Sequence, residues 1–435
     1  MTRKPAVGIL SLGCSRNLVD SELLLGRLSG KGFRVTDLQK AEIGVVNTCA
    51  FVQDAKTESI EAIAELVELK KAGRLKKIIV CGCLVQRYGE ELRKGFPEVD
   101  AFIGSPGLDL GKERYALTPA SYAYLKICEG CVNKCSFCAV PGIKPRLESL
   151  EEKQVIEKLA GFDRQGIPEI DIIGQDITGY GLDRGPSRRL HTRRGLDRGG
   201  EGLARIVSLI LKKSKFSPRW FRLLYLHPAR VSDKLLRLVR DDPRMCKYID
   251  LPLQHINDRV LKAMNRHTSK ADILRLLERV RGTIPGVAVR TAFIVGFPGE
   301  TDKEFEELLS FIREARFERL GCFIYSREEG TAAASMKGQV PEKVKQERLD
   351  RVMRLQQDIS REHNAALMGR TLDVLIDEEE DGRYLGRTQA DAPEVDGSVF
   401  VSSKRRLKTG EMVRARVTDT LEYDICAEVE DEHPQ

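Results

Sequence analysis

Three short apolar runs, at residues 7–10, 45–46 and 78–80, open the chain and have the length of buried strands. Apolar residues recur with helical spacing after the second run, at residues 60–67. This alternation predicts a small α/β domain over residues 1–117. Gly and Pro punctuate residues 100–120, which we interpret as the linker to the next domain.

A strand-then-helix rhythm continues through residues 118–367. Its apolar runs of strand length are residues 122–127, 170–173, 221–226, 249–253, 287–295 and 322–325. Helical periodicity separates them, for example at residues 274–281 and 305–312. The pattern predicts an incomplete parallel (β/α)6 barrel, with its functional side chains after the carboxyl ends of the strands. Residues 184–202 interrupt it with Arg and Gly, and their composition indicates a solvated, flexible insert more than a nucleic-acid patch.

The last part of the chain begins with a charged run of helical periodicity at residues 342–364, which Met368, Gly369 and Arg370 end. Short strand candidates follow at residues 371–376, 384–388, 399–401, 412–417 and 424–429. They predict a small antiparallel β-barrel over residues 368–435, comparable to oligonucleotide-binding folds. The fold class is therefore α/β, with an all-β domain at the end.

Composition adds modest limits to this picture. The chain has 435 residues, of which 41% are hydrophobic and 31% charged, as expected for a soluble protein of two or three domains. No run approaches the eighteen or so apolar residues of a membrane span, so we expect no membrane partner. The net charge of +7 suits an anionic or ribosomal partner. Reduced cysteines without a signal segment indicate a cytoplasmic location.

Cysteines dominate the candidate chemistry. Cys128, Cys131, Cys135 and Cys138 lie close together, and the last three form Cys-x3-Cys-x2-Cys with Phe137 before the third. Thiolates at this spacing suit a cluster better than a core. Three thiolates on a four-iron cube leave one iron free to bind another molecule. The stretch is therefore a candidate for holding such a cluster.

A zinc site is the alternative interpretation of these four cysteines. Paired zinc ligands are usually separated by about a dozen residues or more, whereas only three residues lie between Cys131 and Cys135. Disulfides fit less well, because cysteines are few for the length of the chain. A non-catalytic zinc- or RNA-binding scaffold stays open as a function of another class.

A second group of cysteines follows the three strands of the first domain. Cys14, Cys49 and Cys83 each come directly or almost directly after an apolar run. Any one alone would more often be a small buried residue than a ligand. Loops at the carboxyl ends of parallel strands open into one crevice, so all three are expected to converge. We interpret them as ligands of a second 4Fe–4S cluster.

Polar residues after the barrel strands are further candidates for the site. They are Gln175, Asp176, His227, Gln254, His255 and Glu300 in the turn Gly-Phe-Pro-Gly-Glu. Each could equally be a loop cap or a turn residue. Gly296 and Gly299 fit tight turns or close backbone approach.

The Cys-x3-Cys-x2-Cys stretch resembles the signature of radical S-adenosylmethionine enzymes. The resemblance implies that Cys131, Cys135 and Cys138 are ligands of a 4Fe–4S cluster and that Cys128 is a spare. In that superfamily the open iron binds S-adenosylmethionine, and an injected electron releases a 5′-deoxyadenosyl radical. The blocks SLGCSRNLVDSE, VVNTCAFVQDAKTESI and CGCLVQRYGEEL resemble the amino-terminal domain of methylthiotransferases, in which Cys14, Cys49 and Cys83 match the cluster ligands. The final barrel resembles their TRAM domain. The resemblance implies two 4Fe–4S clusters, two uses of S-adenosylmethionine, and a reducing partner such as flavodoxin or ferredoxin.

The chain departs from the family after Cys138. The family usually has Ile-Pro, then an Arg-Gly and a Ser-Arg pair, whereas this chain has Val140-Pro141, Lys144-Pro145 and Ser149-Leu150. Two arginines are thus missing, and Arg146 is the candidate replacement.

The phrases LGCSRNLVDSE, LPLQHINDRVLKAMNR and ADAPEVDG resemble the branch that methylthiolates an aspartate of the twelfth small-subunit ribosomal protein. Residues 377–381 with Asp391, Glu394 and Asp396 predict an acidic TRAM surface, which would repel phosphates and suit a basic protein. The expected substrate is therefore this ribosomal protein or its subunit. A tRNA adenosine methylthiotransferase is the alternative, with tRNA as the less favoured partner. The implied reaction removes a hydrogen from the aspartate β-carbon and attaches a methylthio group there.

Overall fold

The computed structural model describes residues 4–105, 107–108, 114–184, 200–216 and 219–430. The chain divides into two compact units. Unit 1 comprises residues 1–117, 126–157 and 326–334, and unit 2 comprises residues 118–125, 158–325 and 335–435. Compactness thus groups the cysteine-rich stretch with the amino-terminal residues. The three-domain boundaries drawn from the sequence stay a prediction.

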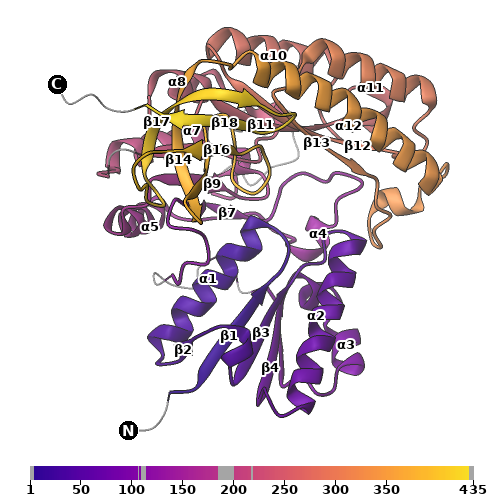
Figure 1. Ribbon diagram of the computed structural model, residues 1–435. Coiled ribbons are helices and arrows are strands. Elements are labelled where there is room, and N and C mark those ends of the chain that lie inside the picture. The colour runs from indigo at the N-terminus through magenta and orange to yellow at the C-terminus, as the bar shows by residue number, and fades with distance from the viewer. Residues whose placement is uncertain (1–3, 106, 109–113, 185–199, 217–218, 431–435) are drawn as a thin grey trace. The chain divides into compact units, whose positions relative to one another are not determined.

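Unit 1 is built on a parallel sheet with the strand order β2-β1-β3-β4-β5 (Figure 1). Its strands are β1 (Ala6–Ser11), β2 (Arg34–Val35), β3 (Ile43–Thr48), β4 (Lys77–Gly82) and β5 (Ala101–Ile103), and its helices are α1 (Ser15–Gly30), η1 (Leu38–Lys40), α2 (Gln53–Lys71) and α3 (Cys83–Gly95). The three predicted strands are confirmed. The predicted linker is wrong at its start, because Ala101–Ile103 pair with β4 as an edge strand.

Apolar side chains hold helices on both faces of this sheet. Val7 and Val45 pack with Leu25 of α1 on one face, whereas Val46 and Val80 belong to the core formed with α2 and α3 on the other. The strand order places β1 and β3 side by side, with the connections from them running to opposite faces. Ligands of such open sheets bind at this switch point, outside the carboxyl ends of the strands.

The cysteine-rich stretch of unit 1 is closed by a short antiparallel pair. β7 (Cys128–Glu129) pairs with β8 (Glu148–Ser149), and the loop between them contains α4 (Val140–Ile143). Cys128 is fully buried in β7 and lies opposite Ser149. The remaining three cysteines of the stretch lie inside the loop.

Unit 2 contains the predicted barrel strands in two sheets, with the orders β10-β9-β6 and β11-β12-β13. They are β6 (Tyr122–Lys126), β9 (Glu169–Ile173), β10 (Trp220–Leu223), β11 (Tyr248–Gln254), β12 (Ala288–Val295) and β13 (Arg319–Ile324). The pairings β9–β10, β11–β12 and β12–β13 are parallel. An isolated parallel β-bridge joins Phe221 of β10 to Met245, which precedes β11. All predicted strands of the barrel are confirmed.

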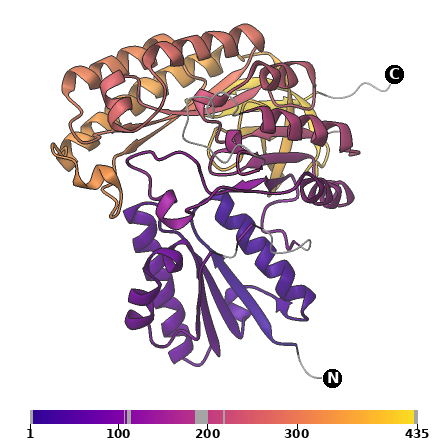
Figure 2. The same cartoon turned by 180° about the vertical axis from the view of Figure 1, so that it is seen from behind.

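Helices connect these strands and cover them. They are α5 (Glu152–Gln165), η2 (Ile177–Gly179), α7 (Glu201–Lys213), η3 (Pro228–Arg230), α8 (Asp233–Asp241), α9 (Asp258–Ala263), α10 (Lys270–Thr283), α11 (Asp302–Ala315), η4 (Ala332–Ser335) and α12 (Glu342–Ala365). Seen from behind in Figure 2, α10, α11 and α12 form one layer, and α12 packs on β13. Most of the predicted insert, residues 185–199, lies outside the described residues, and its predicted end is wrong because Glu201 and Gly202 begin α7.

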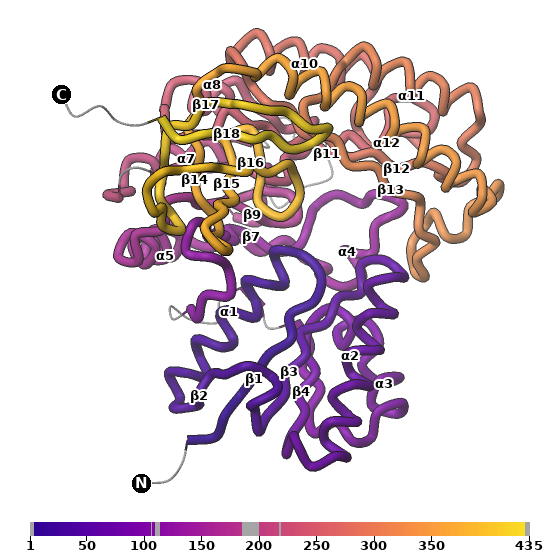
Figure 3. The backbone as a smooth tube through the Cα atoms, in the orientation of Figure 1, coloured from indigo at the N-terminus to yellow at the C-terminus, as the bar shows by residue number. Residues whose placement is uncertain are grey.

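The TRAM region of unit 2 is a closed barrel in the order β14-β15-β16-β18-β17 (Figure 3). Its strands are β14 (Thr371–Glu380), β15 (Arg383–Arg387), β16 (Val399–Ser402), β17 (Met412–Thr420) and β18 (Ile425–Val429). The predicted strands are confirmed. The prediction of a purely antiparallel barrel is wrong in one place, since β16 and β18 run parallel.

Candidate functional site

The three amino-terminal cysteines lie at one edge of the unit 1 sheet. Cys14 is the N-cap of α1, Cys49 follows β3 directly, and Cys83 is the first residue of α3. Cys83 lies close enough to Cys14 and Cys49 for their charges to affect its pKa. The predicted convergence is confirmed, and it occurs at the switch point between β1 and β3, with β4 beside them.

Two glycines allow this close approach. Gly13 has φ +86°, and a Cβ there would lie 2.6 Å from Cys49 Cβ and 2.7 Å from Cys49 Sγ. Gly82 has φ +100°, and a Cβ there would lie 2.3 Å from Asn47 Oδ1. Neither position accepts a side chain, because both the backbone conformation and the space forbid it. The absence of a side chain before Cys14 therefore lets Cys49 pack against that turn.

Buried polar side chains that sequence reasoning missed hold the turns in place. Asn17 Nδ2 donates to the carbonyls of Leu12 (2.7 Å) and Thr48 (3.1 Å), and Asn47 Nδ2 donates back to the Asn17 carbonyl (2.8 Å). The available signal was the pair Asn47-Thr48, two polar residues that end an otherwise apolar buried strand. These buried hydrogen bonds tie the backbone of the two turns together.

Two hydroxyl groups fasten the turns of Cys49 and Cys83 in the same way. Thr48 Oγ1 donates to the Cys81 carbonyl (2.6 Å) and accepts from the Leu84 amide (3.3 Å), so it joins β3 to the start of α3. Ser59 Oγ of α2 accepts from the Cys49 amide and donates to its carbonyl, both at 3.0 Å.

The electrostatics of the three thiols differ. Burial alone would raise the pKa of Cys14, but the Arg16 guanidinium and the Asn17 amide outweigh it and lower that pKa. Burial raises the pKa of Cys49, and it raises the pKa of Cys83 to about 12 although Lys144 acts against it. A bound cation would reverse this burial effect, because metal binding needs thiolates. The donor set therefore fits an iron–sulfur cluster, with Cys14 as the most acidic ligand.

The second group, Cys131, Cys135 and Cys138, shares one loop of unit 1. Burial raises the pKa of Cys138 to about 12, and the neighbouring Cys135 and Cys131 raise it further. Gly130, with φ +76°, opens the loop, and a Cβ there would lie 1.9 Å from the Arg146 carbonyl oxygen. The backbones of Gly130 and Arg146 therefore pack directly against each other at the two ends of the loop, next to β7 and β8. The set of three neighbouring thiols fits a cluster with one iron left open.

Lys144 is the cation of the stretch after Cys138 that points into unit 1. Lys144 Nζ donates to the Glu129 carboxylate and to Ser105 Oγ. Arg146 is exposed, and Leu150 is buried in the core at 2% exposure. The loop directs Lys144 inward, and the substitution of Arg146 for the missing arginines stays a prediction.

The polar candidates of the unit 2 barrel are mostly bound in caps and turns. Asp176 accepts from the amide (3.0 Å) and hydroxyl (2.5 Å) of Thr178 and pairs with Arg230. His227 Nδ1 accepts from the Ala229 amide (3.2 Å), and His255 Nδ1 from the Asn257 amide (3.0 Å).

The turn after β12 is held in a similar way. Glu300 accepts from the Phe297 amide (3.0 Å) and faces Arg348 of α12 (3.3 Å). Gly296 and Gly299 have φ +71° and +77°, which confirms their interpretation as turn glycines. Asp176, His227, His255 and Glu300 thus each hold a local cap or turn, and their part in the site stays a prediction.

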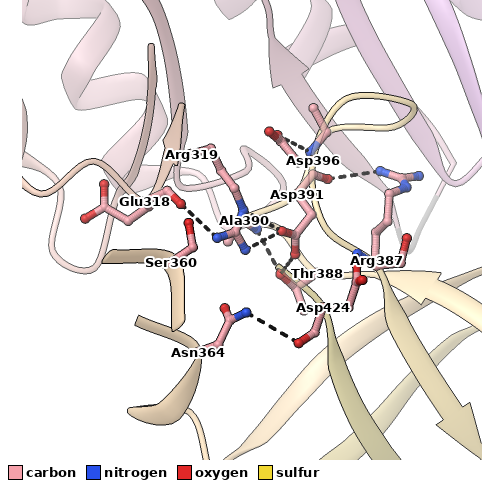
Figure 4. Close-up of polar contacts among 12 residues, drawn as sticks. Glu318, Arg319, Ser360, Asn364, Arg387, Thr388, Ala390, Asp391, Asp396 and Asp424 are labelled. Carbon is pink, nitrogen blue, oxygen red and sulfur yellow. Dashed lines mark hydrogen bonds and ion pairs between the residues drawn. The ribbon is translucent and has the colours of Figure 1, made fainter. Parts of the chain in front are cut away.

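The acidic surface predicted from the sequence is wrong for three of its eight residues, Asp377, Asp391 and Asp396, whose side chains are largely buried in ion pairs. Asp391 binds Arg319 of β13 and accepts from Thr388 Oγ1 (2.6 Å), as Figure 4 shows. Asp396 accepts from Tyr248 Oη (2.6 Å) and faces Arg290 (3.2 Å). Asp391 and Asp396 thus join the carboxyl-terminal barrel to β11, β12 and β13. Glu394 accepts from Tyr122 Oη of β6, whereas Asp377 pairs with Arg387 inside the barrel. The other five, residues 378–381 and Glu394, are exposed, so the prediction is confirmed for them.

Within the described ranges, no group of three or more His, Cys, Asp or Glu side chains is arranged to hold a metal ion as it stands. The assignment of the six cysteines to clusters therefore rests on their grouping and chemistry and stays a prediction. No helix in the described parts of the chain is long and apolar enough to cross a membrane.

Comparison with known families gives three successive matches. Residues 6–104 match the uncharacterized protein family UPF0004, residues 125–312 the radical SAM superfamily, and residues 368–429 the TRAM domain. The ribosomal protein uS12 methylthiotransferase RimO of Thermoanaerobacter sp. (strain X514) is 42% identical over 97% of this chain and 99% of that protein. The chain belongs to the RimO family. RimO of Caldanaerobacter subterraneus subsp. tengcongensis is 44% identical over 97% and 99%, and that of Bacteroides thetaiotaomicron 42% over 98% and 99%.

Solved structures show the same fold at low sequence identity. The radical S-adenosylmethionine methyltransferase TsrM from Kitasatospora setae, with cobalamin and a [4Fe-4S] cluster bound, aligns with a TM-score of 0.50 at 14% identity, covering 76% of this chain and 77% of that one. The radical enzyme OxsB aligns with a TM-score of 0.50 at 15% identity, over 81% and 56%. As a member of the RimO family, the protein is a radical SAM methylthiotransferase. Its cofactors are S-adenosylmethionine and 4Fe–4S cluster iron.

Proposed function

We propose that this protein attaches a methylthio group to the β-carbon of an aspartate in ribosomal protein uS12. The relatives that match nearly the whole chain are named ribosomal protein uS12 methylthiotransferase RimO. The observation that supports the proposal most strongly is the presence of both cysteine triads in unit 1. Cys14, Cys49 and Cys83 would hold one cluster, and Cys131, Cys135 and Cys138 the other.

The bound cofactors supply a radical able to remove a hydrogen from an unactivated carbon, which an acid–base pair of side chains could not do. The protein's own task is to hold and orient. Three cysteines per cluster leave one iron position open in each. The caps and buried bonds around the cysteine turns keep the thiols in register, so that little reorganisation accompanies binding.

A reducing partner of the flavodoxin or ferredoxin type and a cytoplasmic location are parts of the same proposal. Reduction of a radical SAM cluster needs a low-potential electron donor, and ribosomal substrates are cytoplasmic. Cluster assembly needs reduced cysteines, which a reducing compartment maintains.

The test is an anaerobic reaction of the reconstituted protein with reductant, S-adenosylmethionine and sulfide, offered uS12 and tRNA together. Mass spectrometry should find a methylthio group in place of hydrogen on one aspartyl peptide of uS12, and no modified tRNA nucleoside. Replacing that aspartate with asparagine should remove the signal. Modification of tRNA alone would contradict the proposal.

A further inference from the structure

Four charged side chains form a buried cluster in unit 1. Lys126 Nζ donates to the Asp20 carboxylate and lies 3.5 Å from Glu129 Oε1, and Lys144 Nζ also binds Glu129. The side chains of Lys126, Asp20, Glu129 and Lys144 are 1%, 3%, 7% and 11% exposed. Two positive and two negative groups thus neutralise one another out of contact with water. We call this set the four-charge cluster.

The four-charge cluster joins the supports of both cysteine triads. Asp20 lies on α1, whose first turn carries Cys14. Glu129 lies two residues before Cys131, and Lys144 six residues after Cys138, so they hold both ends of the second cysteine loop. A rigid helix is therefore tied to both ends of the loop through two lysines.

A separate contact links the same two regions. Glu328 lies 2.9 Å from Lys56 Nζ and 3.1 Å from Arg87 Nη1, and Arg87 donates to the Ala50 carbonyl (3.0 Å) beside Cys49. The Ala333 amide of the same segment donates to the Ser136 carbonyl (2.8 Å), inside the second loop. Both triads are thus connected at a second point.

Buried ion pairs are a poor source of stability, because desolvation of the charges offsets most of their attraction. Apolar residues of similar size would stabilise this core at least as well. What charged groups add is direction, since each lysine must meet its carboxylates at a defined distance and angle. The cluster is therefore better explained by the geometry it imposes than by stability.

We propose that the four-charge cluster positions the two cysteine triads relative to one another and so sets the separation of their two iron–sulfur clusters. The proposal rests on the proposed function, in which sulfur from one cluster must meet a substrate radical generated at the other. Reacting atoms must approach to about 3–3.5 Å, and a 1 Å displacement can cost about a hundredfold in rate. Asp20, Lys126, Glu129 and Lys144 are thus positioning residues for the transfer step.

The test variant is the double substitution Asp20→Asn/Lys126→Met, which removes one charge of each sign and keeps the cluster neutral. We expect iron and sulfide content and 5′-deoxyadenosine release to persist. The yield of methylthiolated uS12 per deoxyadenosine should fall about tenfold or more. Pulsed electron paramagnetic resonance on the reduced protein should show a shifted or broadened distribution of cluster-to-cluster distances.

Two further proteins separate this role from a general loss of stability. Lys70→Met/Asp100→Asn removes an ion pair of unit 1 (2.6 Å) that lies near the start of β4, at the sheet edge opposite the cysteines, and should change neither readout. Lys126→Arg keeps the positive charge and should therefore retain more methylthiolated uS12 per deoxyadenosine than Asp20→Asn/Lys126→Met. If Asp20→Asn/Lys126→Met does not fold, Glu129→Gln/Lys144→Met carries the same test from the loop side.

An unchanged product ratio and an unchanged distance distribution in a folded double variant would overturn the proposal. Failure of the proposed function looks different, because the unmodified protein would then lack two clusters or leave uS12 unmodified. Iron analysis and the uS12 assay on the unmodified protein are therefore made first.

Discussion

The two cysteine triads of unit 1 are built in opposite ways. Cys131, Cys135 and Cys138 share one loop that β7 and β8 close, so their grouping is written into eight consecutive residues. Cys14, Cys49 and Cys83 come from the ends of three strands and meet only because β1, β3 and β4 are neighbours in a parallel sheet. The loop triad, Cys131, Cys135 and Cys138, depends on local chain geometry. The strand-end triad, Cys14, Cys49 and Cys83, depends on the topology of the sheet.

This difference predicts where each site is vulnerable. The loop triad should respond to changes within the loop, whereas the strand-end triad should respond to changes at several places in the sheet. Gly13, Asn17, Thr48 and Ser59 each hold a part of it through buried contacts. The strand-end triad therefore offers more ways to lose a cluster without touching a cysteine.

The largest effect should come from replacing a single cysteine of one triad or the other with alanine. Cys131→Ala should reduce 5′-deoxyadenosine release to background, because the cluster predicted to bind S-adenosylmethionine would lose one of its three cysteine ligands. Cys49→Ala should retain that release and lose methylthio transfer. Chromatography of deoxyadenosine and mass spectrometry of uS12 measure both, and retained transfer in Cys49→Ala would refute separate roles for the two triads.

A matched pair of glycine substitutions should separate the two sites next. Gly13→Ala would place a Cβ 2.6 Å from Cys49 Cβ, and Gly130→Ala one 1.9 Å from the Arg146 carbonyl, each at positive φ. The strain is about 1–3 kcal/mol before any clash. Gly13→Ala should lower iron content and keep deoxyadenosine release, and Gly130→Ala should lower both.

Gly73→Ala is the control for both glycine variants. Gly73 has φ +73°, but no atom lies within 4 Å of a Cβ there. Its iron content should match that of the unmodified protein. Equal loss of iron in all three variants would mean that backbone strain alone, and not the cysteine turns, explains the effect.

A smaller effect is expected from Thr48→Val. The change leaves the Cys81 carbonyl and the Leu84 amide without their hydroxyl partner, at a cost of about 1–3 kcal/mol in the free energy of unfolding. Denaturant unfolding of the apoprotein should show this, together with slower cluster assembly. Thr57→Val, at an exposed hydroxyl of α2, should change stability by about 0.5 kcal/mol or less. Equal effects of the two substitutions would contradict a special role for Thr48.

The smallest effect should come from the cysteines outside both triads. Cys81 is 1% exposed within β4, and Cys128 is fully buried in β7. Cys81→Ala and Cys128→Ala should lower stability by about 1 kcal/mol or less and leave iron content unchanged. Loss of iron in Cys128→Ala would add a fourth residue to the loop site.

Sequence patterns predicted the strands well because a buried strand is a short run of apolar residues. The runs at residues 45–46 and 78–80 became β3 and β4, and the order of strand, cysteine and helix was enough to predict convergence. The edge strands β2 and β5 were missed because two or three residues carry no periodicity.

Partners far apart in sequence were beyond such reasoning. Asp391 looked like surface charge, but its partner Arg319 lies on β13 of the barrel, and only the fold brings the two together. Lys144 looked like a lost arginine, and the burial of Glu129 and Asp20 around it explains its direction inward. Local pattern shows which residues are charged and leaves open which of them are paired.

The most direct test of the two-site account is iron analysis with Mössbauer spectroscopy on three anaerobically reconstituted proteins. They are the unmodified chain, a variant with Cys14, Cys49 and Cys83 replaced by alanine, and one with Cys131, Cys135 and Cys138 replaced. The account predicts about eight irons per chain in the first and about four, as one [4Fe–4S] cluster, in each of the others. Loss of all iron in either variant, or full retention in both, would contradict it.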